Sequence, residues 1–261
     1  MTYQTIRVET DARGVATLTL ARPEKRNAMS AQMIAELTQA AQSLGADATV
    51  RVVILAAEGD SFCAGGDLVW MQAQMAADGV TRAAEARKLA MMLAALNSLP
   101  KPLIGRVQGQ AYGGGIGMMS VCDVAIGVEG ARFGLTETRL GLIPATIGPY
   151  VVARMGAAKA RRVFASARLF DADEALRLDL LARVVPAAAL DDAVEAEVTP
   201  YLSCAPGAVA EAKALIRALS PMPDAGQIEA SIAALVTRWE SPEAAEGITA
   251  FFAKGKPGWA K

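Results

Sequence analysis

Two glycine-rich stretches contain the residues of this chain that are best suited to chemistry. Ser61–Leu68 reads SFCAGGDL and Gly109–Gly117 reads GQAYGGGIG, and each is expected to join a strand end to a helix start. Glycine lets a backbone approach a ligand closely, and the first turn of a helix leaves N–H donors unpaired. Such loops stabilise an anion, either a phosphate or an oxygen that gains negative charge during a reaction. Taken alone, the pair is also typical of structural turns.

The composition narrows the chemistry further. No Gly-Lys-Ser/Thr follows either loop and neither contains a full GxGxxG after a first strand, which excludes common nucleotide sites. The chain has no histidine, so histidine-based nucleophile systems, histidine-ligated metals and imidazole catalysis are excluded. Proton transfer must use Asp, Glu, Lys, Tyr, Cys or water. Cys63, Cys122 and Cys204 are widely spaced, which predicts neither a disulfide framework nor a metal site.

The elements expected to position the loops alternate between strands and helices. Short apolar runs predict strands at 6–8, 15–20, 52–56, 103–107, 124–128 and 183–185, and Ser30 is a plausible N-cap for the first helix. This alternation predicts an α/β fold with a parallel sheet. Ala-rich helical segments at 151–154, 157–166, 171–178, 188–202, 206–219 and 225–239 dominate the second half. We therefore expect a core over residues 1–199 and a helical region over 200–261.

Charge and hydropathy limit the partners and the location. The 261 residues are 53% apolar and carry 26 Lys and Arg against 27 Asp and Glu, so the net charge is −1. No field of one sign dominates, which argues against nucleic-acid or membrane-surface binding. The N-terminus lacks the features of a signal peptide, and no apolar run approaches the ~18 residues of a spanning helix. We expect a soluble, cytoplasmic protein.

Five segments, in order along the whole chain, resemble the enoyl-CoA hydratase/isomerase (crotonase) superfamily. They are 22–28 (RPEKRNA), 62–68 (FCAGGDL), 109–123 (GQAYGGGIGMMSVCD), 133–144 (FGLTETRLGLIP) and 251–257 (FFAKGKP). The resemblance implies an α/β crotonase-type spiral of repeated ββα units with a C-terminal helical trimerisation region. It also implies a homotrimer or a dimer of trimers, and an acyl-CoA substrate whose coenzyme A takes the place of a separate cofactor.

The resemblance further implies the residues of the site. Backbone N–H groups of Ala64 and Gly114 would hold the thioester oxygen, which gains charge when the adjacent carbon exchanges a proton. The segment Ala64, Gly65, Gly66, Asp67 and Leu68 would contact coenzyme A, and Trp70 would wall the acyl pocket unless it is a core residue. Lys25 and Lys254 would bind the cofactor's phosphates, the latter from a neighbouring subunit, unless both are solvated surface charges.

The carboxylates depart from the hydratase pattern. Hydratases of this family carry one glutamate after the Gly-Gly-Gly run and a second after the Phe-Gly-x-x segment; here the second is Glu137 and the first position is Gly117. Glu137 is therefore the one catalytic carboxylate that the resemblance supplies. The alternative is a structural Glu137 paired with Arg139. We expect Gly117 to open room for a bulky acyl group.

Two segments resemble bacterial 3-methylglutaconyl-CoA hydratase-like members, namely 67–71 (DLVWM) and 142–149 (LIPATIGP). The expected activity is hydration of an α,β-unsaturated, branched acyl-CoA such as 3-methylglutaconyl-CoA, in leucine or branched isoprenoid breakdown. Three alternatives stay open: a Δ3,Δ2-enoyl-CoA isomerase, a different non-redox acyl-CoA lyase, and a catalytically silent acyl-CoA-binding paralogue.

Overall fold

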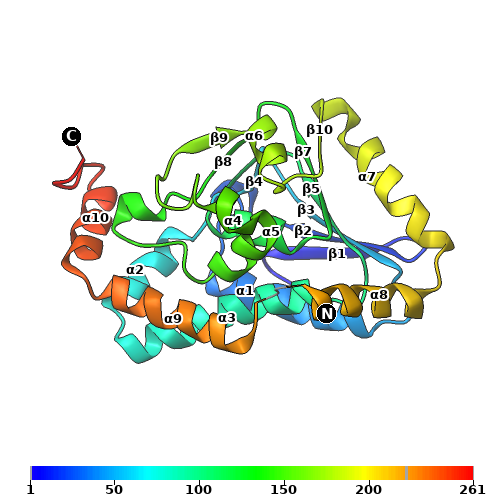
Figure 1. Cartoon of the computed structure of the whole chain (residues 1–261), viewed down its shortest axis with the longest axis horizontal. Coiled ribbons are helices and arrows are strands. Elements are labelled where there is room, and N and C mark those ends of the chain that lie inside the picture. Colours follow the sequence, from blue (N-terminus) through cyan, green and yellow to red (C-terminus); the bar gives the residue numbers. More distant parts are fainter. Residues whose placement is uncertain (1, 221–222, 261) are drawn as a thin grey trace.

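Two sheets form the centre of the computed structural model, which describes residues 2–220 and 223–260 (Figure 1). In spatial order, the six-stranded sheet comprises β1 (Ile6–Thr10), β2 (Val15–Leu20), β3 (Val52–Ala57), β5 (Leu103–Val107), β7 (Val124–Val128) and β10 (Arg183–Val185). The four-stranded sheet comprises β4 (Ser61–Cys63), β6 (Gln110–Tyr112), β8 (Arg132–Gly134) and β9 (Leu169–Asp171).

The chain passes repeatedly from the first sheet to the second. β1 and β2 form an antiparallel hairpin with Ile6 opposite Leu20, and from β2 to β10 neighbouring strands of the large sheet are parallel. β3 leads into β4, β5 into β6 and β7 into β8, and a helix follows each passage. β4, β6 and β8 are parallel to one another, so their carboxyl ends lie at one edge of the small sheet. Those ends carry both glycine loops.

The helices surround these sheets. They are α1 (Ala31–Ala46), α2 (Leu68–Ala76), α3 (Gly79–Asn97), α4 (Gly114–Val121), α5 (Gly148–Ala160), α6 (Ala172–Arg177), α7 (Leu190–Val198), α8 (Pro206–Leu219), α9 (Ala225–Trp239) and α10 (Pro242–Phe252). Short 3-10 turns are η1 (Pro23–Lys25), η2 (Glu137–Leu140), η3 (Ala187–Ala189) and η4 (Thr199–Ser203). Ser30 caps α1 as expected, with its Oγ accepting from the Met33 N–H at 3.2 Å.

Three helical predictions need correction. The two helices expected at 151–154 and 157–166 are one element, α5, interrupted at Gly156, whose φ of 72° is not helical. The expected helix 188–202 is α7 flanked by two 3-10 turns, and α10 was not expected at all. The short strands of the small sheet were also missed, because three residues carry too little periodicity to predict a strand.

The core lies between the large sheet and the helices packed on it. Leu18 and Leu55 on the central strands are fully buried, together with Leu37 of α1 and Leu93 of α3. The central strands are continuous apolar runs because they are covered on both faces. Each such leucine stabilises the fold by about 2 kcal/mol relative to an exposed one. This core holds rigid the strand ends from which the glycine loops project.

The C-terminal helices pack on the core. α9 lies along α3, and α10 lies against η2 (Figure 1). Arg238 of α9 donates from Nε to the Gly141 carbonyl at 3.0 Å, and Arg87 of α3 pairs with Glu229 of α9. A division of the chain at residue 200 stays a prediction.

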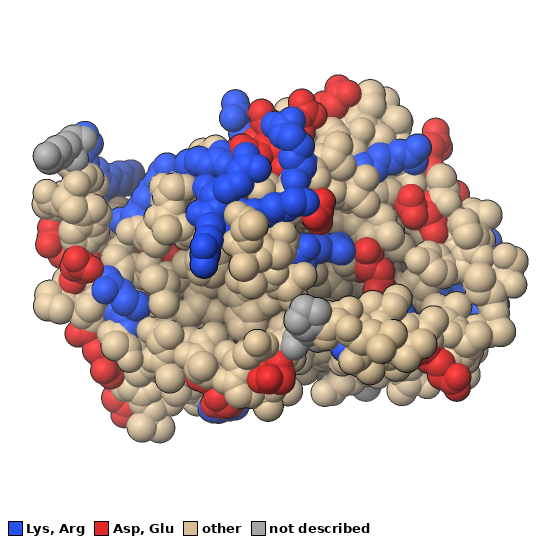
Figure 2. All heavy atoms as spheres, in the orientation of Figure 1, with Lys and Arg blue, Asp and Glu red and all other residues tan. Residues whose placement is uncertain are grey.

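Figure 2 shows the charges of one face. Lys and Arg gather over the region of β9 and α6, with Asp and Glu among them and along the lower edge. Within the described residues, no helix combines the length and the apolar character needed to cross a membrane.

Candidate active site

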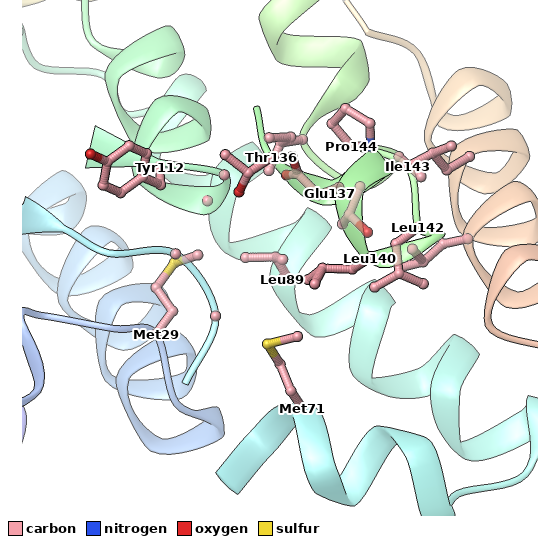
Figure 3. A pocket seen from close by; sticks show the side chains of 18 of the residues that line it. Met29, Met71, Leu89, Tyr112, Thr136, Glu137, Leu140, Leu142, Ile143 and Pro144 are labelled. Atoms are coloured by element: carbon pink, nitrogen blue, oxygen red, sulfur yellow. The ribbon is translucent and has the colours of Figure 1, made fainter. Parts of the chain in front are cut away.

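A cavity of about 550 Å³ opens beside the starts of α2 and α4, where the two glycine loops meet. Its wall is largely apolar and is drawn from segments far apart in the sequence. Figure 3 shows Met29, Met71 and Leu89 on one side, facing Glu137 and Leu140 on the other. Leu235 and Trp239 of α9 and Phe251 of α10 complete the wall, so the C-terminal helices help to form the site.

The second glycine loop places an unpaired donor on this wall. Gly113 adopts a φ of 46°, which favours glycine, and its N–H donates to the Gly134 carbonyl at 3.1 Å. Gly114 is the first residue of α4, and its N–H has no acceptor among the described residues. A Cβ on Gly114 would overlap the terminal methyl group of Met29, so a larger residue here would require that flexible side chain to move. Gly114 thus presents a free backbone donor on the cavity wall, and its binding of a thioester oxygen stays a prediction.

The first glycine loop corrects the prediction for Ala64. The Ala64 N–H donates to the Arg26 carbonyl at 3.0 Å and is therefore not free to bind a ligand. Gly66 also lines the cavity, and no acceptor within residues 2–220 or 223–260 takes its N–H. The free backbone donor of this loop is thus Gly66, two residues after Ala64. Sequence reasoning missed it because the hydrogen bond to Arg26 joins segments that are far apart in the chain.

Asp67 has a structural part in this loop. Its Oδ1 accepts from the Val69 N–H at 2.9 Å and caps α2, and its Oδ2 accepts from Arg22 at 3.0 Å. Burial alone would raise the pKa of Asp67, but Arg22 and the capping N–H groups hold it below the usual value. The side chain is buried and absent from the cavity wall. It orients the loop rather than facing a ligand.

Glu137 is the carboxylate of the cavity. It begins η2, and Figure 3 shows its side chain on the wall between Thr136 and Leu140. Its Oε2 is completely buried and has no hydrogen-bond partner among the described residues. Glu137 forms no ion pair with Arg139 in that part of the chain, so the structural alternative is wrong.

This environment changes the acidity of Glu137. Burial raises its pKa to about 7, and a hydrogen bond from its own backbone N–H opposes the shift only in part. A carboxyl group with this pKa exists in both forms near neutral pH, which suits a general acid or base. An unpaired, partly desolvated carboxyl in an apolar cleft is also typical of functional sites.

Gly117 does not open room in the cavity, contrary to expectation. It lies inside α4, off the cavity wall, and a Cβ placed on it would lie 2.7 Å from Cγ2 of Ile147. Leu93 packs on the same spot. The space that a side chain at position 117 would need is thus filled by Ile147, which itself lines the cavity. The wall on this side is apolar.

The remaining predicted residues divide into two groups. Gly65, Leu68 and Trp70 line the cavity, and Nε1 of Trp70 donates to Glu85 at 3.4 Å. Lys25 and Lys254 are exposed and do not line it. Across residues 2–220 and 223–260, no group of three or more His, Cys, Asp or Glu side chains could hold a metal ion.

Comparison with known proteins identifies the family. The family model described as enoyl-CoA hydratase/isomerase matches residues 10–261. This chain belongs to the enoyl-CoA hydratase/isomerase family. The crystal structure of an enoyl-CoA hydratase from Shewanella pealeana superposes with a TM-score of 0.81 at 35% identity, over 98% of this chain and 96% of that one.

Two further members show the same relationship. The crystal structure of an enoyl-CoA hydratase from Mycobacterium smegmatis superposes with a TM-score of 0.80 at 34% identity, covering 99% of this chain and 100% of that one. An enoyl-CoA hydratase of Alternaria alternata is 32% identical over 211 residues, which are 78% of this chain and 67% of that protein. The predicted superfamily and the crotonase-type α/β fold are confirmed.

Proposed function

We propose that the protein adds water reversibly to an α,β-unsaturated, branched acyl-CoA, with 3-methylglutaconyl-CoA as the first-choice substrate. Membership of the family implies an acyl-CoA substrate, so coenzyme A enters with the substrate and no separate cofactor is needed. The observation that carries the proposal is the buried, unpartnered Oε2 of Glu137, in the same apolar cavity as two free backbone donors.

The backbone donors are assigned to the thioester oxygen. Proton exchange next to a thioester places negative charge on that oxygen, and the N–H groups of Gly66 and Gly114 would stabilise it. Each such donor typically lowers the barrier by about 3 kcal/mol in a site that excludes water.

Glu137 is assigned both proton transfers. One oxygen of its protonated carboxyl group gives a proton to C2, while the water oxygen bonds to C3 and the C2=C3 π bond breaks. The proton lost by the water passes to the other carboxylate oxygen, so that Glu137 ends the step protonated. A pKa of about 7 makes both the donation and the uptake accessible at neutral pH.

Thr146 is assigned to the attacking water. It lies on the cavity wall next to Ile147, and its Oγ1 is buried without a partner among the described residues. An ordered water needs two or more polar partners. Glu137 and Thr146 would provide them, in place of the second glutamate that Gly117 cannot supply.

A branched substrate accounts for a site with one carboxylate. Hydration of 3-methylglutaconyl-CoA places the hydroxyl on a tertiary carbon, where positive character is better stabilised in the transition state and less acid–base help is needed. Arg139 lines the cavity, is exposed, and has no ion-pair partner in the described ranges. It is available to pair with the distal carboxylate of such a substrate.

A specific observation also favours a second candidate, a Δ3,Δ2-enoyl-CoA isomerase. The part of the wall next to Gly117 is apolar because Ile147 lies there. This is where the other glutamate of the hydratases would stand. An isomerase needs one carboxylate, which takes a proton from C2 and returns it to C4 without any water.

A mass-spectrometric assay of crotonyl-, 3-methylcrotonyl-, 3-methylglutaconyl- and 3-enoyl-CoA separates these candidates. The proposal expects a product 18 Da heavier from the branched 2-enoyl substrates, in keeping with addition of one water. Isomerisation of the 3-enoyl substrate alone would support the second candidate. Binding without turnover on every substrate would contradict both and indicate a silent paralogue.

Thr146→Val sharpens the distinction because valine keeps the shape and removes the hydroxyl. Hydration by the variant should fall about tenfold or more, since a buried hydrogen bond to the water is lost, while Thr146→Ser should restore it. Any isomerisation of 3-enoyl-CoA should be unchanged by either substitution. Equal hydration rates in Thr146→Val and the wild type would contradict the assignment of Thr146.

The assembly and the location belong to the same proposal. Leu215, Ile216 and Leu219 of α8 are 59%, 62% and 77% exposed, an apolar face that the homotrimer or dimer of trimers would cover. Lys254 would then reach the cofactor's phosphates of a neighbouring subunit. The cytoplasmic location and the role in leucine breakdown stay predictions.

A further inference from the structure

A second cavity of about 530 Å³ lies apart from the active site and shares no lining residue with it. It is enclosed by the end of α4 and the start of β7, by α5, by the turn around Tyr201, and by α8. α8 forms one side of it with Val209, Ala212, Lys213, Ile216 and Arg217. The acyl-CoA chemistry proposed above uses none of these residues.

Positive charge exceeds negative charge around this cavity. Three cations line it, namely Arg154, Lys213 and Arg217, whereas Asp123 is the one carboxylate among its lining residues. Asp123 is already engaged. Its Oδ2 accepts from Lys213 Nζ at 2.6 Å and from the Leu103 N–H at 2.7 Å, and among the described residues it makes no ion pair with either arginine.

Arg154 has a role that is in part structural. Its Nη2 donates to the Cys122 carbonyl at 2.5 Å, beyond the last turn of α4, which suits a cation at a helix C-terminus. Its Nε is buried and has no acceptor among the described residues. Nη2 of Arg154 therefore has a hydrogen-bond acceptor, whereas its Nε has none among the described residues.

Arg217 has no acceptor in the part of the chain that the structure describes. In the ranges 2–220 and 223–260 it makes no hydrogen bond or ion pair, although its Nη1 is completely buried. Arginine is never deprotonated at physiological pH, and a buried, unpaired guanidinium is unfavourable. Burial lowers the pKa of the neighbouring Lys213, Asp123 opposes this shift in part, and the charge of Arg217 adds to it. The site lacks an anion.

The shape of the cavity indicates the kind of anion. A guanidinium matches two oxygens of a carboxylate or a phosphate. Beyond the Lys213–Asp123 pair, Arg154 and Arg217 make no ion pair among the described residues, so two positive charges of the lining are unbalanced and either a carboxylate or a phosphate would match them. The apolar part of the lining favours an organic acid over inorganic phosphate. The volume exceeds that of an inorganic ion, and Pro102, Val121, Val124 and Ile216 provide apolar surface for a hydrocarbon body.

We propose that this second cavity is a binding site for a small organic carboxylic acid, whose carboxylate pairs with Arg217 and Arg154 beneath α8. A side chain from a second copy of the chain is a weaker explanation, because one unpaired nitrogen of each arginine, Nε of Arg154 and Nη1 of Arg217, is buried rather than on the surface.

Calorimetric titration of the full-length protein with sodium butyrate tests the proposal. Wild type should show saturable binding, and Arg217→Gln should raise the dissociation constant at least about tenfold, as loss of a charged hydrogen-bond pair does. Arg161→Gln removes the same charge from an exposed position outside both cavities and should bind butyrate as wild type does. Hydrogen exchange of the wild type adds a test without any substitution, because butyrate should protect α8.

Four results would overturn the proposal. They are no saturable butyrate binding by the wild type, equal binding by Arg217→Gln, binding of inorganic phosphate but not butyrate, and a change of oligomeric state in Arg217→Gln without any anion binding. The last would assign the missing acceptor to a second copy of the chain.

Discussion

The catalytic role that we propose for Glu137 comes with a cost to the fold. The carboxyl group lies in an apolar cavity with one oxygen buried and unpartnered, and this burial raises its pKa to about 7. The same desolvation that makes it a useful acid or base disfavours its ionised form in the folded state. Activity and stability are therefore expected to oppose each other at this residue.

Glu137→Gln should stabilise the protein at alkaline pH. The folded pKa lies above the unfolded value of 4.5, so the folded state keeps a proton that the unfolded state loses. Wild-type stability should then fall by about 3 kcal/mol as the pH rises from 4.5 through 7, and a glutamine avoids this loss. Urea unfolding at pH 5 and pH 8 measures the difference.

The exposed Glu129→Gln is the matched control and should show no such dependence on pH. If Glu137→Gln differs from the wild type by the same free energy at both pH values, the carboxyl group is not desolvated as described.

At the scale of the elements, the two glycine loops act together because β4, β6 and α4 hold their ends in register. Gly114 presents its N–H at the start of α4, and Gly66 presents its N–H from the loop after β4. α4 also carries Gly117, whose Cβ position is closed off by Ile147. The same helix thus provides a backbone N–H donor at Gly114 and carries no carboxylate at position 117.

Substitutions at Gly66 separate its N–H from its small size. A Cβ at this position would lie 3.5 Å from the Met71 side chain, an ordinary contact, so Gly66→Ala should retain activity. Gly66→Pro lacks the N–H and should lower kcat by about 10²-fold or more. Circular dichroism must show intact folding in both variants. Equal activity of the two variants would assign the oxygen-binding donor elsewhere.

At the scale of the molecule, the site is formed by packing between distant parts of the chain, and we expect it to need no bound ion. The absence of histidine and of metal-ligand clusters in the described residues leaves no obvious transition-metal site. We expect turnover to be unchanged after dialysis against EDTA. Loss of activity in the chelator, with recovery on adding zinc, would contradict this expectation.

The sequence predicted the strands and helices that carry clear periodicity. The predicted boundaries of α8 and α9 agree with the structure because each helix has a strong apolar face. The short strands β4, β6, β8 and β9 were not predicted, because they depend on pairing between distant segments.

Prediction of the candidate site from the sequence meets the same limit. Glu137 and Gly114 were found from their motifs, and the structure places both on the cavity wall. The engaged N–H of Ala64 and the closed space at Gly117 were not predictable, because Arg26 and Ile147 reach them only through the tertiary fold. Long-range contacts of this kind have no local signal in a single sequence.

The central claim is that Glu137 is the single acid–base group of the site. Steady-state kinetics of Glu137→Gln on the preferred enoyl-CoA substrate test it most directly, with acyl-CoA affinity measured in parallel. The account predicts that kcat falls by about 10²–10⁴-fold, because proton transfer is lost, while affinity changes little, because the side chain keeps its size. A variant that retains near wild-type kcat would contradict it.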